Sequence, residues 1–101
     1  MNAELVWTER AESDLKTIYE FNCDTIGEAK AWDLVLELER FISETLSQTM
    51  DVSMPDFQFF HLSSDYRKIL KGRHKVTFVE RGGKKIILRI FDSRQHPDKN
   101  L

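Results

Sequence analysis

Apolar residues in the first half of the chain recur at helical spacing and predict two amphipathic helices. Over Glu9–Phe21 they recur every three or four residues and share one face, at Ala11, Leu15 and Ile18, which Tyr19 widens. A wider apolar stripe runs over Glu28–Leu46, at Ala31, Leu34, Val35, Leu38, Phe41 and Ile42. The break between them, Asn22–Gly27, is short, so we expect an antiparallel helical hairpin.

Short apolar runs elsewhere predict strands. Ala3–Trp7 precedes the first helix, and Thr8 after it is a good N-cap residue. Ser47–Asp56 is predicted to be a polar loop, whereas Phe57–Leu62 (FQFFHL) fits a strand, a turn of helix or an apolar plug. Three further runs indicate strands, over Tyr66–Leu70, His74–Glu80 and Lys84–Asp92.

Gly82 and Gly83 predict a two-residue hairpin turn, because both positions can adopt a positive φ. Around such a turn the numbers of paired residues sum to 165, which defines the register of the last two strands. The predicted pairs are Val79 with Ile86, Phe78 with Ile87, Glu80 with Lys85, Thr77 with Leu88, Val76 with Arg89 and His74 with Phe91. Both faces of this hairpin are partly apolar, so one is expected to cover the helices and the other to hold a groove or a partner.

The order of the elements indicates an α+β fold: β-α-α-β-β-β, an antiparallel sheet with the N-terminal helical hairpin packed on one face. A length of 101 residues with 41% hydrophobic residues suits a single domain over residues 1–101. No apolar run approaches the ~20 residues that span a bilayer, and the N-terminus does not resemble a signal peptide. Cys23 is the only cysteine, so no internal disulfide can form, which fits a reducing, cytoplasmic location.

Charge divides the chain into two unlike parts. Residues 1–65 carry four basic and 14 acidic residues, a net charge of −10. Residues 66–101 carry 11 basic and three acidic residues, a net charge of +8. This asymmetry points to an acidic or polyanionic partner for the basic part. The alternative is internal, with acidic helices lying beside a basic sheet.

The residue types needed for most catalytic chemistry are not arranged in recognisable motifs. His61, His74 and His96 lack metal-ligand spacing, and no phosphate-binding loop or nucleophile motif is present, so we expect neither a metal nor a cofactor. Metal-free cleavage of RNA through its own 2′-hydroxyl stays open, since it needs only a base, an acid and cations. Those groups could come from Arg73, His74, Lys75, Arg89, Arg94 and His96, which could equally be solvated strand and tail residues.

An ordered set of residues in the last third resembles the C-terminal half of the RelE/ParE superfamily of bacterial toxins, which belong to type II toxin–antitoxin systems. The matching positions are Tyr66-Arg67, Gly72-Arg73-His74, Val76–Val79, Ile87–Ile90 and Asp92-Ser93-Arg94. The N-terminal part, WTERAESDLKTIYEF and IGEAKAWDLVLELERFISETL, is similar to the opening strand and two helices of the superfamily. The resemblance covers nearly the whole chain and implies a RelE/ParE-like fold.

Within the superfamily, the helical hairpin and the Gly-x-His turn look more like the ParE branch. That resemblance implies a toxin, as in plasmid stabilization systems, that inhibits DNA gyrase and does not cut RNA. The RelE branch cleaves mRNA on the ribosome and commonly has an arginine where this chain has His74. ParE toxins often have a histidine where this chain has Asp92. A RelE-like endoribonuclease is therefore the alternative, with Arg73, His74, Arg94 and His96 as its catalytic residues, and a member that only binds protein is a third reading.

The resemblance also implies a partner, since antitoxins of this class wrap the toxin with an extended or helical C-terminal segment. An acidic segment of this kind is expected to be drawn to the basic part of the chain. The residues expected to line the contact with antitoxin or target are Arg67, Arg73, Lys75, Arg89 and Arg94. A homodimer and a toxin–antitoxin heterotetramer are both compatible with the resemblance.

Overall fold

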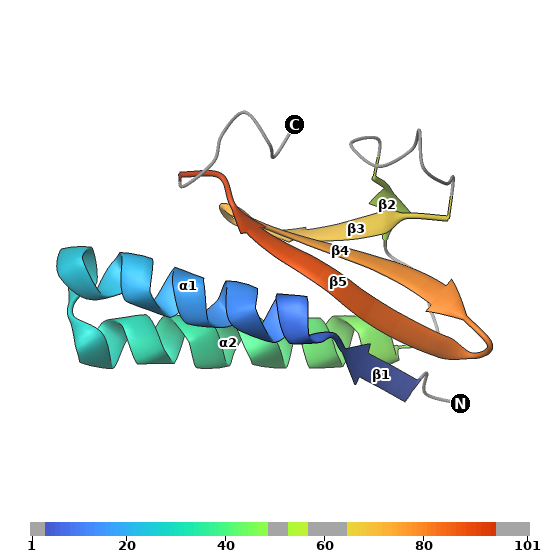
Figure 1. The fold of residues 1–101 in the computed structure, drawn as a ribbon, viewed down its shortest axis with the longest axis horizontal. Helices are drawn as coiled ribbons and strands as arrows, with labels where there is room; N and C mark the ends of the chain where they lie inside the picture. Colours follow the sequence, from blue (N-terminus) through green and yellow to red (C-terminus); the bar gives the residue numbers. More distant parts are fainter. Residues whose placement is uncertain (1–3, 49–52, 57–64, 95–101) are drawn as a thin grey trace.

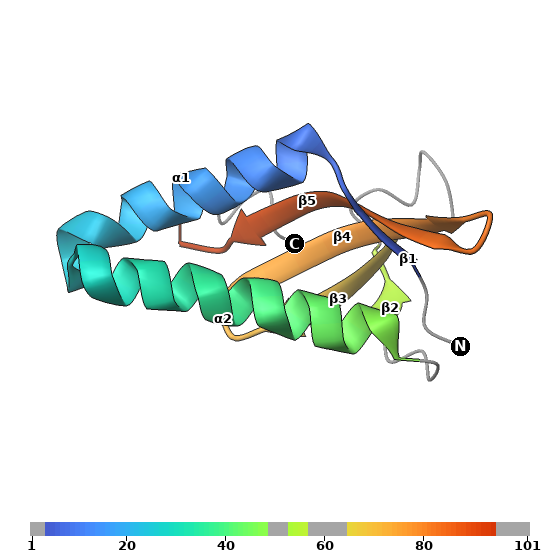
Figure 2. The same ribbon diagram turned by 90° about the horizontal axis from the view of Figure 1, so that it is seen from below.

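The computed structural model describes residues 4–48, 53–56 and 65–94. Its elements are β1 (Glu4–Trp7), α1 (Glu9–Ile26), α2 (Glu28–Ser47), β2 (Met54–Pro55), β3 (Arg67–Lys71), β4 (His74–Arg81) and β5 (Lys84–Asp92). The strands form one sheet in the order β1-β5-β4-β3-β2, and the helical hairpin covers one of its faces (Figure 1, Figure 2). The predicted α+β architecture is confirmed, while the ambiguous segment Phe57–Leu62 lies outside the described residues.

The first helix is longer than its sequence pattern predicts. It begins where predicted, with the Thr8 Oγ1 accepting a hydrogen bond from the Ala11 amide at 3.1 Å. It then continues to Ile26, so the predicted break at Asn22–Gly27 is wrong except for its last residue. Asn22 is tolerated inside the helix because its buried side-chain amide donates to the Ile18 carbonyl at 2.7 Å. The turn is therefore a single residue, Gly27, whose φ of 87° favours glycine.

The core lies between the helical hairpin and the sheet. Both helices present their predicted apolar faces to it, and β3, β4 and β5 contribute one face each. Its fully buried members include Ile18, Leu38, Ile42, Val76, Phe78 and Ile87. Burying one such side chain stabilises the fold by about 1.5–3 kcal/mol. No helix within the described residues combines the length and apolar character needed to cross a bilayer.

Two strands differ from the sequence-based prediction of an antiparallel sheet with four strands. β1 joins the sheet at its edge in parallel with β5, so the sheet is mixed. β2 falls inside the predicted loop Ser47–Asp56, where two residues pair with β3. Its Pro55 lacks an amide donor and is tolerated because the strand lies at the edge of the sheet. Two other strands differ only in their bounds: β3 is Arg67–Lys71 instead of Tyr66–Leu70, and β4 ends at Arg81 instead of Glu80.

The predicted register of β4 and β5 is correct near the turn and wrong beyond it. Phe78 pairs with Ile87, as predicted, but an irregularity between Thr77 and Phe78 shifts the remaining pairs by one residue. The observed partners are Thr77 with Arg89, Val76 with Ile90, Lys75 with Phe91 and His74 with Asp92. The extra residue is Leu88, which forms a β-bulge. Without it Arg89, and not Ile90, would lie under the helices, so burial of Ile90 selects the shifted register.

Side chains from the start of α1 cover the edge of β5 where β1 ends. β1 pairs with β5 only as far as Ile87. Beyond it, the Thr8 hydroxyl donates to the Ile87 carbonyl at 2.7 Å, and the Asp14 carboxylate accepts from the Ile90 amide at 2.8 Å. The same carboxylate accepts from Nε of Arg89 at 2.9 Å. These contacts satisfy backbone groups of β5 that no strand reaches.

We predict that Asp14→Ala lowers the free energy of unfolding by about 2 kcal/mol, because it leaves the Ile90 amide and the Arg89 guanidinium without their acceptor. Urea denaturation measures the change. Arg10→Ala is the matched control, since Arg10 also pairs with Asp14 but at 3.6 Å and with a side chain that is 65% exposed. It should change stability by less than about 0.5 kcal/mol. Equal losses in the two variants would contradict the role assigned to the β5 edge.

Candidate functional site

The candidate cations of the last three strands do not converge on one site. The two faces of β4 separate His74, which faces the helices with Val76, from Lys75, which lies on the opposite face. Arg67 donates to the hydroxyl and the carbonyl of Ser53, and Arg89 is paired with Asp14. Arg67 and Arg89 are therefore each held by a neighbouring residue within the fold.

Lys75 belongs to a buried polar cluster on the sheet face away from the helices. Its Nζ lies 3.2 Å from the Asp56 carboxylate and 4.9 Å from the centre of the Phe91 ring. The other oxygen of Asp56 accepts a hydrogen bond from the Thr77 hydroxyl at 2.7 Å. Burial lowers the pKa of Lys75, and the charge of Asp56 opposes that shift. In this arrangement the ammonium group of Lys75 is not presented at the surface.

A second polar cluster joins the end of the sheet to the end of α1. The Asp92 carboxylate lies 3.3 Å from Nε2 of His74 and 2.7 Å from the Arg94 guanidinium. Arg94 also donates to the Asn22 side-chain oxygen at 2.9 Å and lies 5.3 Å from the centre of the Phe21 ring. Arg94 is therefore oriented by three residues before any ligand is considered.

The three titratable groups of this second cluster, His74, Asp92 and Arg94, have pKa values that are shifted in different directions. Burial lowers the pKa of His74, although the Asp92 carboxylate opposes the shift. Burial alone would raise the pKa of Asp92, but the hydrogen bonds from Arg94 together with nearby positive charge outweigh it, and the pKa is lowered. The hydrogen bond to Asp92 raises the pKa of Arg94. His74 is consequently neutral at pH 7, and its buried Nε2 has no hydrogen-bond partner among the described residues.

Lys71, Arg73 and Arg94 lie together at a groove between the helical turn and the β3–β4 turn. This basic groove has a volume of about 460 Å³ and is lined by Asn22, Ile26, Leu34, Lys71, Gly72, Arg73, His74 and Arg94. Arg73 is exposed and forms no ion pair with any residue of the described ranges. The groove thus brings together three residues of the predicted site, Arg73, His74 and Arg94, whereas His96 lies outside the described residues.

Within the part of the chain that the structure describes, the sheet edge next to the basic groove has no strand beside it. β2 pairs only with Arg67 and Lys68 of β3, and Ile69–Lys71 has no strand partner on that side among the described residues. Leu70 in this stretch is 50% exposed. The open edge runs directly into the β3–β4 turn, so one extended segment could contact both.

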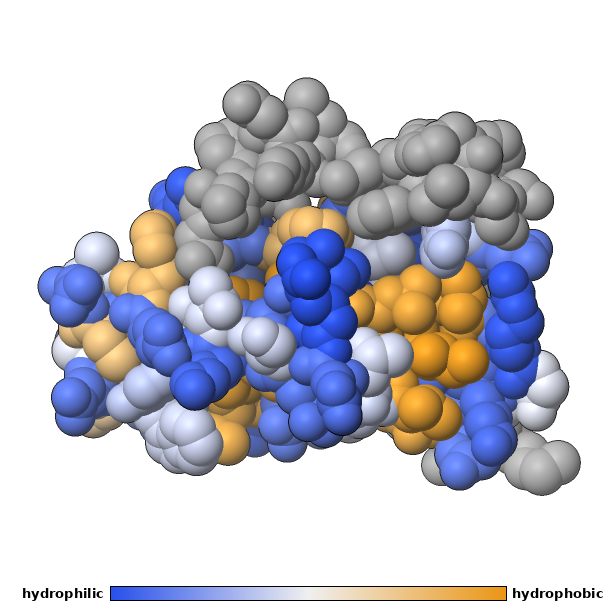
Figure 3. Space-filling model, in the orientation of Figure 1, coloured by the Kyte–Doolittle hydropathy of each residue, from blue (hydrophilic) through white to orange (hydrophobic). Residues whose placement is uncertain are grey.

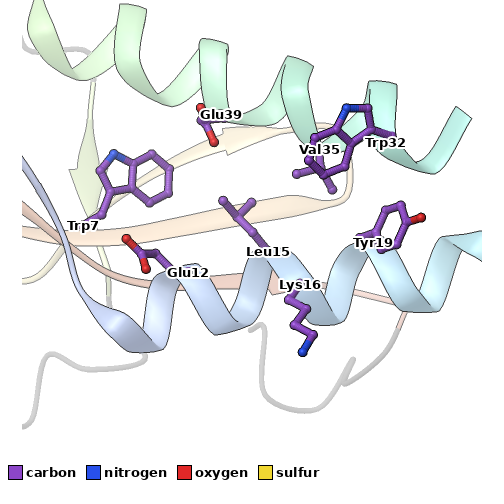
Figure 4. A pocket seen from close by; sticks show the side chains of 8 residues that line it. All are labelled: Trp7, Glu12, Leu15, Lys16, Tyr19, Trp32, Val35 and Glu39. Carbon is purple, nitrogen blue, oxygen red and sulfur yellow. The ribbon is translucent and has the colours of Figure 1, made fainter. Parts of the chain in front are cut away.

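Sequence reasoning did not find a third feature, a groove between α1 and α2. This interhelical groove has a volume of about 440 Å³ and is lined by Trp7, Glu12, Leu15, Lys16, Tyr19, Trp32, Val35 and Glu39 (Figure 4). The rings of Tyr19 and Trp32 meet edge to face, with centres 5.9 Å apart. One signal was present: Trp32 lies outside the predicted apolar stripe of its helix, and it is 54% exposed.

An apolar surface also occurs over β1 and the adjoining part of β5, in the orientation of Figure 1 (Figure 3). Val6, Ile86 and Leu88 of these strands are half-buried.

Within the ranges that the structure describes, no group of three or more acidic, histidine or cysteine residues could hold a metal ion.

We predict that acid weakens the fold through His74. The unfolded chain protonates this residue near its ordinary pKa of 6.5, whereas the folded chain does so only at lower pH. The contribution of His74 to the free energy of unfolding is therefore fully present above pH 6.5 and decreases as the pH falls through and below that value. Asp92 adds to the loss at lower pH, below its ordinary pKa of 3.8. Urea denaturation at about pH 7 and about pH 5.5 should show a smaller decrease for His74→Gln than for the unmodified chain. An identical decrease in both would exclude His74 as the cause.

The comparison with solved structures agrees with this architecture. A chain from the solved structure of a chromosomal ParDE TA system from P. aeruginosa superimposes with a TM-score of 0.76 and 24% sequence identity. The match covers 89% of this chain and 95% of that chain. No protein-family model matches the sequence, and no curated protein matches it significantly. The chain therefore shares the α+β fold of that chain of the ParDE structure.

Proposed function

We propose that this chain is a ParE-like toxin of a type II toxin–antitoxin system, that it inhibits DNA gyrase, and that a cognate antitoxin neutralises it. The observation that carries the proposal is the likeness of almost the entire fold to a chain of a ParDE system. The residues that resemble the superfamily, from Tyr66 to Arg94, support the proposal as well, because they lie in β3, β4 and β5 or directly beside them, where the resemblance implies strands and turns. A gyrase inhibitor acts in the cytoplasm, where the proposal places the chain.

The arrangement of the cations favours docking over cleavage of RNA. Attack by a 2′-hydroxyl needs a base, an acid and phosphate-binding cations around one reacting centre. Here His74 is buried against Asp92 on the helix side of β4, while Lys75 and Arg89 lie on the opposite face. The protein would have to rearrange for these groups to meet at one phosphate.

A RelE-like, ribosome-dependent mRNA endoribonuclease is the second candidate, and one observation favours it. Arg73, His74 and Arg94 all line the basic groove, so a phosphate there would have cations and an imidazole nearby. The exposed Arg73 and the oriented Arg94 would then bind phosphate, and His74 would act as the base. This candidate requires the His74 ring to become accessible.

The basic groove and the open edge of β3 fit a single antitoxin segment. An extended segment would add a strand beside Ile69–Lys71 and continue past the turn. Acidic side chains following it would meet Lys71 and Arg73, both exposed, and an apolar side chain would contact Ile26, which is 41% exposed. Arg94 would contribute within the groove itself and Arg67 nearby, whereas Lys75 and Arg89 are paired with Asp56 and Asp14 and would contribute little positive potential.

We expect the purified chain to inhibit supercoiling by DNA gyrase and to leave mRNA intact in a ribosome-dependent cleavage assay. Addition of the cognate antitoxin should restore supercoiling. Cleavage of mRNA that is lost in Arg94→Ala and His74→Ala, with unaffected gyrase, would establish the endoribonuclease instead. Absence of both activities would leave a domain that only binds protein and would overturn the proposed toxicity.

Charge reversal in the basic groove tests the antitoxin contact. Lys71→Glu/Arg73→Glu should weaken binding of the cognate antitoxin by about tenfold or more and reduce the dependence of affinity on salt, because attractive charge is lost. Calorimetry at two salt concentrations measures both effects. Lys84→Glu is the control, since Lys84 is exposed at the other end of β5. Equal affinities for the two variants would contradict the assignment of the groove.

A further inference from the structure

The short strand β2 is the middle of a strap, Ser53–Asp56, that lies along the edge of β3. Its two apolar side chains, Met54 and Pro55, are both exposed and do not belong to the core. Its two ends make polar contacts instead: the first residue accepts hydrogen bonds from Arg67, and the carboxylate of the last residue, Asp56, is fully buried. Another segment can reproduce polar contacts of this kind, which is not true of packing in the core.

The strap occupies most of the outer edge of β3. The Tyr66 carbonyl accepts a hydrogen bond from the Asp56 amide at 2.9 Å, and Met54 lies opposite Lys68. Alternate residues of a strand direct their backbone groups to the same side, so Leu70 is the next residue on this edge. It has no strand partner among the described residues. A segment that binds beside the strap therefore reaches one edge residue, whereas a segment that replaces the strap reaches three.

The last residue of the strap also places a negative charge on the face of the sheet away from the helices. One carboxylate oxygen of Asp56 lies 3.2 Å from Nζ of Lys75, and the other accepts from the Thr77 hydroxyl at 2.7 Å. Both partners are buried. A buried ammonium group that loses its carboxylate is strongly destabilising. A segment that displaces the strap must therefore bring a carboxylate of its own, which an apolar or a basic segment cannot do.

We propose that the strap is an internal substitute for an acidic extended segment of the antitoxin, and that this segment displaces it. The incoming segment pairs with the three edge residues of β3 and places a carboxylate on Lys75, so each contact is replaced by one of the same kind. The strap is consequently an autoinhibitory contact. It lowers the affinity for the partner by the fraction of molecules in which the edge is uncovered.

This inference rests on the proposed contact between an acidic antitoxin segment and the edge of β3, and it adds a competitor within the chain. It does not depend on gyrase as the target. Charge reversal at Lys71 and Arg73 tests the antitoxin contact, whereas variants of the strap test the competition. The failure of one is therefore distinguishable from the failure of the other.

A disulfide between the strap and β3 tests the displacement. Met54→Cys/Lys68→Cys places the two cysteines directly opposite each other in an antiparallel pair, a separation that suits a disulfide, and Cys23→Ser removes the native thiol. The strap cannot leave β3 in the oxidised form. Calorimetry should show that the oxidised form binds the cognate antitoxin at least about tenfold more weakly than the reduced form of the same protein, which is the matched control.

Weakening the strap should have the opposite effect. Asp56→Asn removes the ion pair that holds the strap but keeps Lys75 for the carboxylate of the antitoxin, so the affinity should increase by about tenfold. A purely structural role of Asp56 would not raise the affinity. Circular dichroism verifies that the variant is folded, and if it is not, the disulfide variant decides alone.

Equal affinities of the oxidised and reduced forms, or an unchanged or lower affinity of folded Asp56→Asn, overturn this inference and leave the proposed function intact. A chain that binds no antitoxin in any form overturns both.

Discussion

The edge of β5 beyond Ile87 is the constraint that ties the helices to the sheet. A strand edge inside a protein must have its amides and carbonyls satisfied, and β1 is too short to do so. Thr8 and Asp14 satisfy it instead, and both belong to the start of α1. Because Thr8 also caps the helix, one residue fixes where α1 begins and where it lies against the sheet.

Fixing α1 in this way positions the groups at its other end. Asn22, four turns later, reaches Arg94, which holds Asp92 and thereby the surroundings of His74. The polar cluster at the end of the sheet therefore depends on a helix whose direction is set at the opposite end. The shape of the basic groove beside this cluster also depends on the position of α1, since Ile26 and Leu34, which flank the helical turn, form part of its lining.

Some of the asymmetric charge of the chain is paired within the fold, and some of it is exposed at the surface. Arg89 pairs with Asp14 and Lys75 with Asp56, so part of the positive charge of the sheet is neutralised by residues from the acidic part of the chain. Arg73 remains exposed at the turn, and the carboxylates of Glu12 and Glu39 remain exposed at the interhelical groove. The protein thus presents two grooves whose linings carry opposite charge.

Local pattern was sufficient for most of the secondary structure, because helical periodicity, the Thr8 cap and the Gly82-Gly83 turn act over short distances. The bulge at Leu88 was not predictable, since apolar residues occur on both faces of β5 and either register looks acceptable until the helices select Ile90 for burial. The true end of α1 was missed because Asn22 satisfies its own amide within the helix. Two further features depend on how distant segments pack: which cations remain exposed, and the position of Trp7 and Trp32 at one groove. The spacing of residues along the sequence does not reveal this packing.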